Sequence, residues 1–446
     1  MATCFPLFAH TSVASERVAW LTRRGRPSQT MAASRSAPPS RSADASAHRL
    51  AGVEILGWEE ARLRIPEWAD LMTRSLETNV FLEPAFALTQ AQHALPAHRP
   101  VFMFVSRTSP GDETGRLIGL CAFSVKGRKF GAVARSWQSR LVALGTPLLD
   151  HTHGAEAFDL ILAWFTRNSG RTAGVLFPAL PASGPTAQLI SERAAALGLH
   201  TRPYDAHVRA VLPAGGDCEA LWRDTIPQKR MKEFRRQYRR LGERGKLTWV
   251  SVRDPQKIRM AMEQFLALES RGWKGNCGSA LLSDPAIRTF VRAMVRMLSQ
   301  QGRCRIDSLE LDGNPVAMGI TIFSGRSAAL WKIAYDETFA AYSPGVQFAL
   351  EFTRRQIADG SIELTDSCAI PDHPMIDRIW PGRMAVCDLL VEVSKDRSDA
   401  FTSAGERERL RRRARGLAKQ FYHMVRNARF AVPLPAHSPG RGNHVR

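Results

Sequence analysis

The sequence predicts a mixed α/β fold, an α+β mixed sheet built from two packed units, on three observations. The chain has 446 residues, more than a usual single domain. Its 44% apolar and 23% charged residues are typical of a globular protein with a substantial core. In the second half, the patterns of secondary structure follow the order helix, helix, three antiparallel strands, helix, strand, strand. No apolar run approaches the about 20 residues that a membrane-spanning helix needs.

Changes in composition divide the chain into four predicted segments. Residues 1–50 are rich in Ser, Ala, Arg and Pro and lack periodicity, so we expect a disordered basic leader. Residues 51–220 and 221–400 each alternate helix and strand patterns and form the two predicted domains. Residues 401–446 are expected to be a basic tail with an amphipathic helix. The start of translation is open, because Met31 lies inside the leader.

The first domain is predicted from helical spacing and from short apolar runs bounded by turn residues. These elements carry no recognisable chemical motif. They are helical spacing near Trp58–Thr78, strands at Val101–Arg107 and Arg116–Lys126, a helix at Ala155–Asn168, a strand at Gly174–Leu180 and a helix at Ala187–Leu197.

The second domain begins with a basic helix over 228–245, in which Met231, Phe234, Tyr238 and Leu241 form one apolar stripe. Gly-containing polar turns then separate three strands, as in hairpins. Asp284 is expected to cap its helix. The further elements are helices at Pro255–Arg271 and Pro285–Gln301, strands at Cys304–Leu311, Pro315–Phe323 and Ser327–Tyr335, a helix after Ser343, and strands at Ser361–Cys368 and Ala385–Val393.

The junction Ala340–Gly345 between a strand and a helix is the sharpest motif. The N-terminus of a helix offers unpaired N–H groups and a positive dipole end, and a glycine permits close approach, so this junction suits the pyrophosphate of coenzyme A. An ordinary capped helix start is the alternative, since Ser-Pro-Gly is a common N-terminal signal. The candidate cofactor-binding residues are Tyr342, Ser343, Pro344, Gly345 and Val346.

Several short sequence motifs, in a fixed order along the chain, resemble those of a known family. The sequence resembles the CelD/BcsL-like acetyltransferases of the GNAT superfamily, which are associated with cellulose and exopolysaccharide synthesis and are related to FemABX-type tandem GNAT proteins. The likeness covers roughly 53–395 and is strongest over 221–395. These motifs lie at Arg271–Gly275, Gly302–Arg305, Leu309–Ala317, Trp331–Glu337, Tyr342–Gly345 and Leu364–Ser367, with a weaker match at Pro147–Asp150.

The resemblance implies two GNAT-like domains in tandem. It implies that the second domain binds acetyl-CoA or another acyl-CoA as donor substrate, and that the first domain mainly shapes the acceptor cleft. A role in polysaccharide synthesis is implied by the family label alone.

Acyl transfer to an amine needs a base for the ammonium, donors for the thioester oxyanion and an acid for the leaving thiolate. Asp366 is the first candidate base, with Asp336 and His373 as further ones, and Tyr335 or Tyr342 is the candidate acid. Each has a plainer interpretation, such as a cap for Asp336, a core edge for Tyr335 and a surface loop for His373. Water and backbone carbonyls also serve as proton acceptors in such enzymes.

Three tryptophans are candidates for lining the acceptor cleft, because aromatic faces suit sugars and acyl groups. They are Trp273, Trp331 and Trp380, and core packing is the alternative for each. Lys332 is a fourth candidate substrate-binding residue. In a regular strand its side chain alternates with that of Trp331, so it is also expected to face solvent.

The net charge of +20 is concentrated in 1–49, 221–246 and 403–446, which favours local anion contacts over a general nucleic-acid-binding surface. The basic helix 228–245 is either a solvated face or a site for CoA phosphate, a phosphorylated acceptor or RNA. The tail helix 406–429 has Leu410, Leu417 and Phe421 on one side, which suits docking on anionic lipid or an acidic partner, or packing on its own domain.

The seven cysteines are odd in number and scattered, and none has the spacing of a zinc site. We therefore expect free thiols, no metal and a reducing compartment.

The leading hypothesis is a cytoplasmic acyltransferase, with peripheral association at the inner membrane as an open alternative. It would move an acetyl or longer acyl group from acyl-CoA to an amine or hydroxyl of a small-molecule or glycan-linked acceptor. One alternative keeps the fold but uses aminoacyl-tRNA as donor. Another is a non-catalytic scaffold that docks on a membrane polysaccharide complex.

Overall fold

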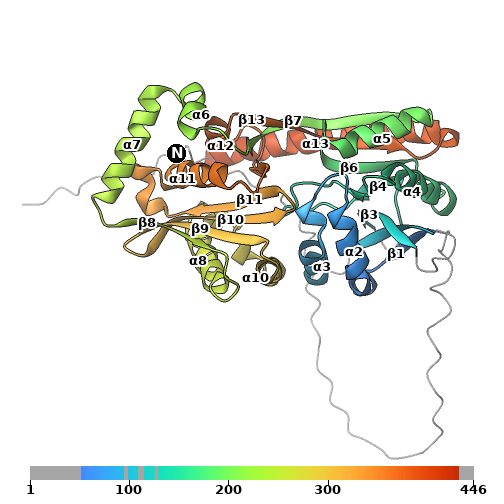
Figure 1. Ribbon diagram of the computed structural model, residues 1–446. Coiled ribbons are helices and arrows are strands. Elements are labelled where there is room, and N and C mark those ends of the chain that lie inside the picture. The colour runs from blue at the N-terminus through green and yellow to red at the C-terminus, as the bar shows by residue number, and fades with distance from the viewer. Residues whose placement is uncertain (1–51, 95–98, 109–114, 126–128, 431–446) are drawn as a thin grey trace, which may run out of the picture.

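The fold was obtained as a computed structural model, in which residues 52–94, 99–108, 115–125 and 129–430 are described. The predicted leader 1–50 and the last part of the predicted tail, 431–446, lie outside the described residues. A single large sheet runs through the whole protein, with helices on both faces (Figure 1).

Twelve strands form the continuous path of this sheet, in the order β1-β2-β3-β4-β6-β13-β7-β12-β11-β10-β9-β8, and β5 pairs with β3 beside it. The strands of the first half are β1 (Val53–Leu56), β2 (Pro100–Arg107), β3 (Arg116–Ser124), β4 (Val133–Ser136), β5 (Leu148–Leu149), β6 (Gly174–Pro181) and β7 (Thr201–Pro213). Those of the second half are β8 (Leu247–Val252), β9 (Cys304–Leu311), β10 (Asn314–Ser324), β11 (Ser327–Tyr335), β12 (Leu364–Asp366) and β13 (Gly382–Glu392).

The pattern of antiparallel and parallel pairs is the same from either edge of the sheet to its centre. Each half contributes four antiparallel strands followed by one parallel strand: β4 runs parallel to β6, and β11 runs parallel to β12. The last strand of each half then crosses over. β13 pairs with β6 of the first half, β7 pairs with β12 of the second half, and the two exchanged strands pair with each other. The halves are therefore two similar units joined by exchanged strands.

Helices cover the sheet and bury an apolar stripe each. In the second half α8 and α10 lie on one face, while α7 and α11 lie on the other (Figure 1). The helices of the first half are α1 (Trp58–Ala61), α2 (Ile65–Thr73), α3 (Pro84–His93), α4 (Gly154–Asn168) and α5 (Pro185–Ala196). Those of the second half are α6 (Cys218–Thr225), α7 (Gln228–Gly242), α8 (Ile258–Arg271), α9 (Trp273–Asn276), α10 (Pro285–Gln300), α11 (Pro344–Ala358), α12 (Ile376–Ile379) and α13 (Ser398–Phe430).

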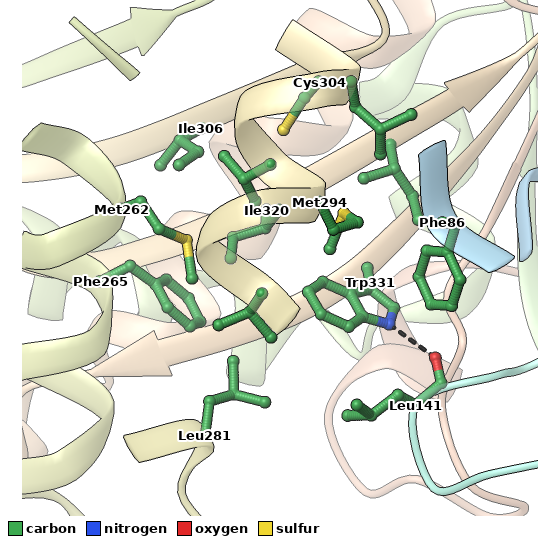
Figure 2. Close-up of a cluster of buried hydrophobic side chains, with 14 of the residues drawn as sticks. Phe86, Leu141, Met262, Phe265, Leu281, Met294, Cys304, Ile306, Ile320 and Trp331 are labelled. Carbon is green, nitrogen blue, oxygen red and sulfur yellow. Dashed lines mark hydrogen bonds between the residues drawn. The ribbon is translucent and has the colours of Figure 1, made fainter. Parts of the chain in front are cut away.

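One hydrophobic core spans the boundary between the halves. Phe86 of α3 and Leu141 of the loop after β4 pack against Trp331 of β11 (Figure 2). The indole Nε1 of Trp331 donates a hydrogen bond of 2.9 Å to the carbonyl oxygen of Leu141. Burial of such large side chains stabilises the contact, since each contributes about 1.5–3 kcal/mol when removed from water. The sheet and this core hold the two halves together.

Most elements predicted from the sequence are present. Asp284 caps α10 as predicted, because its carboxylate accepts from the backbone N–H of Ala286 at 2.9 Å. The predicted strand 361–368 is only Leu364–Asp366, and β7 and β8 were not predicted. Five cysteines in the described part of the chain are free thiols: Cys121, Cys218, Cys304, Cys368 and Cys387. No helix among the described residues combines the length and apolar character needed to cross a membrane.

The crossing of β13 and β7 leads to the first testable prediction. Gly382 faces Val211 in this pairing, and a Cβ added to Gly382 would lie 2.5 Å from the backbone oxygen of Val211. We expect Gly382→Ala to destabilise the protein by about 1–3 kcal/mol, because the strand backbone has to shift. Denaturant unfolding measures this change.

Gly360→Ala is the matched control, since a Cβ at Gly360 meets no atom within 4 Å. It should change the free energy of unfolding by less than about 0.5 kcal/mol. Equal stability of the two variants would contradict the tight pairing of the exchanged strands.

Candidate active site

β11 and β12 pair only over a short distance. The parallel register runs from Ser327 opposite Leu364 to Ala329 opposite Asp366, where β12 ends. β11 continues to Tyr335, while the chain after β12 turns away at Cys368, whose φ is +50°. The outer edge of β11 beyond Ala329 is therefore not paired with β12. This edge is the centre of the candidate site.

A β-bulge lies in β11 at this place. Ile320 of β10 pairs with Lys332 and Thr321 pairs with Leu330, so Trp331 is an extra residue. A bulge interrupts the alternation of side chains and is frequent next to active sites. Accordingly, the Lys332 ammonium lies 5.3 Å from the centre of the Trp331 ring. Lys332 is partly buried and lies beside the Trp331 ring, so its side chain does not extend freely into solvent as regular alternation would predict.

Lys332 is partly buried among other charged groups. Burial lowers its pKa to about 8, the nearby charges of Lys274 and Arg140 add to the decrease, and Glu269 opposes it. Lys274 of α9 has partners of its own, because its ammonium donates to Glu269 at 2.9 Å and to the carbonyl oxygen of Ile333 at 2.8 Å. The thiol of Cys368, also beside Lys332, has a pKa raised well above its usual value by burial. Burial and the charges of Lys274 and Arg140 thus both favour the neutral form of the Lys332 amine.

Asp366, the first candidate base, forms a buried ion pair with Arg209 of β7. The other oxygen of Asp366 accepts from the backbone N–H of Cys368 at 2.9 Å. Arg209 also donates to the carbonyl oxygen of Ala143 in the first half, at 3.0 Å. Burial raises the pKa of Asp366, and the guanidinium of Arg209 opposes that rise. Asp366 therefore links the exchanged strand of the first half to the site.

The other three candidate catalytic residues lie at different points around the site. The Asp336 carboxylate caps the short 3₁₀ helix that follows β11, where it accepts from the N–H and the hydroxyl of Thr338 at 2.9 and 2.7 Å. His373 Nδ1 accepts from the N–H of Met375 at 3.3 Å, and burial lowers the pKa of His373. A neutral His373 then carries its proton on Nε2. Burial, with the charge of Glu337, raises the pKa of Tyr335.

Tyr335 connects the bulged strand with the N-terminus of α11. A Cβ added to Gly345 would lie 3.1 Å from the Tyr335 ring, so the first turn of α11 packs directly on this ring. Ser343 occupies the N-cap position of α11 in a left-handed conformation with φ +52°, and its side chain makes no capping hydrogen bond. Pro344 follows at the first helical position. The N–H groups of Val346 and Gln347 both point to the Ser343 carbonyl oxygen.

The basic helix α7 lies beside the start of α11. The side chain of Gln347 donates to the carbonyl oxygen of Phe234 in α7 at 3.0 Å and to that of Tyr342 at 3.3 Å. A small surface pocket adjoins this contact and includes two arginines, Arg230 and Arg378. Its lining residues are Thr225, Ile226, Pro227, Arg230, Phe234, Val346, Pro374, Met375, Arg378 and Ile379. Positive charge thus accompanies the positive end of the α11 dipole.

The three candidate cleft tryptophans lie in different surroundings. Trp273 of α9 lines a second depression between α8 and the end of β11, together with Lys274 and Tyr335. Trp331 and Trp380 belong to the hydrophobic core, with 4% and 0% of their surface exposed. The Trp380 indole donates to the hydroxyl of Thr353 at 2.8 Å. Core packing, and not an acceptor cleft, is therefore the role of Trp331 and Trp380.

Several residues of the site were not among the predicted ones. They are Arg140, Arg209, Glu269, Lys274, Arg230 and Arg378. Lys274 lies in the motif Arg271–Gly275, one of the motifs that carry the family resemblance. Arg140 and Arg209 come from the first half, and no local pattern marks them. Within the described part of the chain, no cluster of three or more His, Cys, Asp or Glu residues is arranged to hold a metal ion.

Comparison with known families gives a match within the second half of the chain. Residues 228–371 match the model of an acetyltransferase (GNAT) domain. This GNAT domain includes α7, the bulged strand β11, the start of α11 and β12. With the repeated strand order, it confirms the predicted fold class, a mixed α/β GNAT fold consistent with two GNAT-like units in tandem.

Solved structures with similarity to the chain include three that are described as follows. FemX shares 9% identity over 75% of this chain and 96% of its own, with a TM-score of 0.48. The C-terminal domain of a putative lysylphosphatidylglycerol synthetase from Agrobacterium fabrum shares 14% over 77% and 94%, with a TM-score of 0.46. A tandem GNAT protein from the clavulanic acid biosynthesis pathway shares 14% over 77% and 99%, with a TM-score of 0.36. No curated protein matches the chain.

The Asp366–Arg209 pair leads to the second prediction. Asp366→Asn leaves a buried guanidinium without its carboxylate, so we expect a loss of about 3–5 kcal/mol in the free energy of unfolding. Thermal or denaturant unfolding measures this loss. The double change Asp366→Leu with Arg209→Met removes both charges and should recover much of the stability.

The same variants distinguish a structural role of Asp366, in the ion pair, from a role as catalytic base. If the stable double variant retains transfer activity, Asp366 is a structural residue and not the base. An Asp366→Asn variant as stable as the unchanged protein would contradict the buried ion pair.

Proposed function

We propose that this protein is an acyltransferase that moves an acetyl or longer acyl group from acyl-CoA to an amine, or a hydroxyl, of an acceptor. The observation that carries the proposal is the unpaired edge of β11 next to the N-terminus of α11, inside the segment that matches a GNAT domain. An extended ligand arm can hydrogen-bond to such a strand edge. The pyrophosphate of the same ligand would meet the helix N-terminus.

The residues proposed to bind the donor are Tyr342, Ser343, Pro344, Gly345 and Val346, with Arg230 and Arg378 beside them. Gly345 permits the close approach of the helix start to Tyr335, and the arginines supply charge for phosphate groups. Trp273 and Lys332 are proposed to contact the acceptor side of the site.

In the proposed reaction the acceptor nitrogen or oxygen attacks the thioester carbon, and the thiolate leaves with a proton. Tyr335 is the proposed donor of that proton, because its raised pKa keeps the phenol protonated at neutral pH and its ring touches the start of α11. Asp366, Asp336 and His373 remain candidate bases, but each has a hydrogen-bonded structural role. The sequence resemblance to CelD/BcsL-like enzymes supports an acceptor from polysaccharide synthesis, and we include this acceptor in the proposal.

A second candidate donor is aminoacyl-tRNA, which the exposed basic face of α7 favours. In this helix Arg235, Arg236 and Arg239 are exposed and pair only with surface carboxylates, for example Arg235 with Glu219 at 2.7 Å. Exposed pairs of this kind contribute little to stability and leave the cations available for phosphates. Binding of tRNA that weakens steeply with salt would favour this donor.

The third prediction tests the acyl-CoA donor. Isothermal titration with acetyl-CoA, CoA and a long-chain acyl-CoA should show binding by the full chain. We expect Arg230→Glu and Arg378→Glu to weaken it by about tenfold or more, because a hydrogen bond to a charged group contributes about 1.5–3 kcal/mol. Arg288→Glu, an exposed change on α10, should leave the affinity unchanged. Absence of heat with all three ligands would exclude the acyl-CoA donor.

We also propose that α13 docks the protein on an anionic membrane surface. The start of this helix is held to the sheet, since the Tyr204 hydroxyl donates to the Gly405 carbonyl oxygen at 3.0 Å and the carboxylate of buried Glu408 pairs with Arg135. Further along the helix, the side chains of Leu410, Leu417 and Phe421 are exposed. Because these three residues are seven and four positions apart, they form one outward stripe.

Arginines flank this apolar stripe on α13, among them exposed Arg407, Arg411 and Arg413. A basic helix with an apolar face is typical of helices that lie in the interface of an anionic bilayer. Like charges along both sides oppose the pairing of two copies of this helix through the stripe. The surface therefore fits anionic lipid better than a second copy of the chain.

The fourth prediction concerns this surface. The protein should sediment with vesicles of phosphatidylglycerol and phosphatidylcholine, but weakly with phosphatidylcholine alone. Leu417→Glu and Phe421→Glu should each lower vesicle binding by about tenfold or more, since each side chain loses about 1.5–3 kcal/mol of burial. The control is Leu63→Glu, whose side chain is 74% exposed in the first half. Unchanged vesicle binding in the α13 variants, or their loss of a dimer seen in the unchanged protein, would contradict lipid docking.

A further inference from the structure

The short helix α9 is joined to the last part of β11 by the side chain of one lysine. The ammonium of Lys274 donates to the carboxylate of Glu269 at 2.9 Å and to the carbonyl oxygen of Ile333 at 2.8 Å. The other oxygen of Glu269 accepts from the backbone N–H of Leu281 at 2.8 Å, and the side chain of Glu269 is 2% exposed. A buried, anchored carboxylate therefore fixes the position of this ammonium at the strand.

Ile333 lies in the part of β11 that β12 does not pair with, because that pairing ends at Ala329. The N–H of Asp336 donates to the carbonyl oxygen of Val316, at the start of β10, at 2.9 Å. Successive residues of a strand direct their backbone groups to opposite edges, so Ile333, three residues earlier, directs its N–H and carbonyl away from β10. Lys274 thus reaches the outer edge of β11, along which the donor arm is proposed to lie.

The same ammonium lines the depression between α8 and the end of β11. The depression has a volume of about 20 Å³, which is enough for one atom of the size of a water oxygen. Trp273 and Tyr335 line it as well. The side chain of Lys274 is 23% exposed, whereas that of Glu269 is 2% exposed, so the ammonium and not the carboxylate is accessible from the depression.

One N–H group of this ammonium has no partner in the part of the chain that the structure describes. An ammonium has three N–H groups, and the bonds to Glu269 and Ile333 use two of them. Because Glu269 already balances the charge, the third N–H suits a neutral oxygen on which negative charge develops. Desolvation offsets much of the attraction within a buried ion pair, so stability alone does not account for this pair at the strand edge.

We propose that the Lys274 ammonium donates to the carbonyl oxygen of the donor thioester and stabilises the oxyanion that forms there. This inference rests on the proposed acyltransferase function and adds a catalytic residue to it. With the pyrophosphate at the start of α11, the donor arm runs past Tyr335 to the depression, which places the thioester within reach of Lys274. Glu269 is then a positioning residue, because it holds the ammonium in place before the donor binds.

The proposed step is a nucleophilic attack on the thioester carbon. The lone pair of the acceptor forms the new bond, and the C=O pair moves to the oxygen, to which Lys274 donates its hydrogen bond. When that pair returns, the C–S bond breaks and the thiolate takes a proton from Tyr335, which lines the same depression. The proton that the acceptor loses passes to solvent, and the Tyr335 phenolate takes one back from solvent. Lys274 stays protonated throughout.

The experiment observes the thioester carbonyl itself and needs no acceptor. Acetyl-CoA with an isotope label in its carbonyl group is bound to the full-length protein. Difference infrared spectroscopy then compares the C=O stretching frequency of the bound ligand with that of free acetyl-CoA. We expect a lower frequency in the complex, because a charged donor polarises the C=O bond. An unshifted carbonyl in the complex would overturn the proposal.

The variants separate an oxyanion donor from a structural ion pair. Lys274→Met with Glu269→Gln leaves no unpaired charge buried, and this double variant should bind acetyl-CoA but lose most of the frequency shift. Glu269→Gln alone keeps the ammonium and its bond to Ile333, so it should keep the shift. Lys246→Met, an exposed change before β8, is the matched control. The same shift in the double variant as in the unchanged protein would contradict a role of Lys274 at the carbonyl.

A second measurement uses the unchanged protein and therefore does not depend on the folding of a variant. Ethyl-CoA is a thioether that has the same arm as acetyl-CoA but lacks the carbonyl oxygen. Isothermal titration should show that ethyl-CoA binds about tenfold or more weakly than acetyl-CoA, because a hydrogen bond from a charged donor is missing. Equal affinities of the two ligands would overturn the proposal.

The role of Lys274 and the proposed donor can fail separately. Binding of acetyl-CoA with a frequency shift that the double variant retains, or a shift that only Lys332→Met removes, overturns the role of Lys274 alone. Absence of binding by acetyl-CoA, CoA and a long-chain acyl-CoA overturns the proposed donor, and the role of Lys274 falls with it.

Discussion

The exchange of β7 and β13 is the constraint on which the rest of the structure depends. Each half completes its sheet with the final strand of the other, so the hydrogen bonds of β6, β13, β7 and β12 cross between the halves. Since unpaired strand edges are unfavourable, neither half can leave the other without exposing backbone groups. The exchange also places Arg209 of the first half beside Asp366 of the second, at the end of β12.

The candidate site lies along β11, next to these exchanged strands. β12 is short, so most of β11 has an edge that β12 does not pair with, and next to the bulge at Trp331 the Lys332 ammonium lies 5.3 Å from the Trp331 ring. Trp331 itself fills the core and anchors the loop of the first half through Leu141. One strand thus contributes a core side chain, an edge that β12 does not pair with and a partly buried lysine. The lowered pKa of Lys332 is the electrostatic result of this crowding.

The sequence was informative where structure is local. Periodicity and turn residues located most helices and strands of the second half, and the motif before α11 located its N-terminus. The bulge could not be read in this way, because it depends on the register between β10 and β11. β7 was missed for a related reason: its residues 201–208 are mostly exposed and mix polar with apolar types, so no strand pattern stands out. Trp331 and Trp380 could not be assigned to core or cleft, because burial is a property of the packed chain. Arg209 could not be predicted, since it meets Asp366 only through the exchange of strands between the halves.

The two halves have similar strand orders, but their connections after the fourth strand differ. In the second half, the connection after the fourth strand is a short 3₁₀ helix that leads directly into α11. The corresponding connection in the first half, residues 137–153, leaves its own unit and covers Trp331, whose indole donates to the carbonyl oxygen of Leu141. Changes in this loop of the first half would therefore alter the packing of β11, although the loop lies outside the segment 228–371 that matches a GNAT domain.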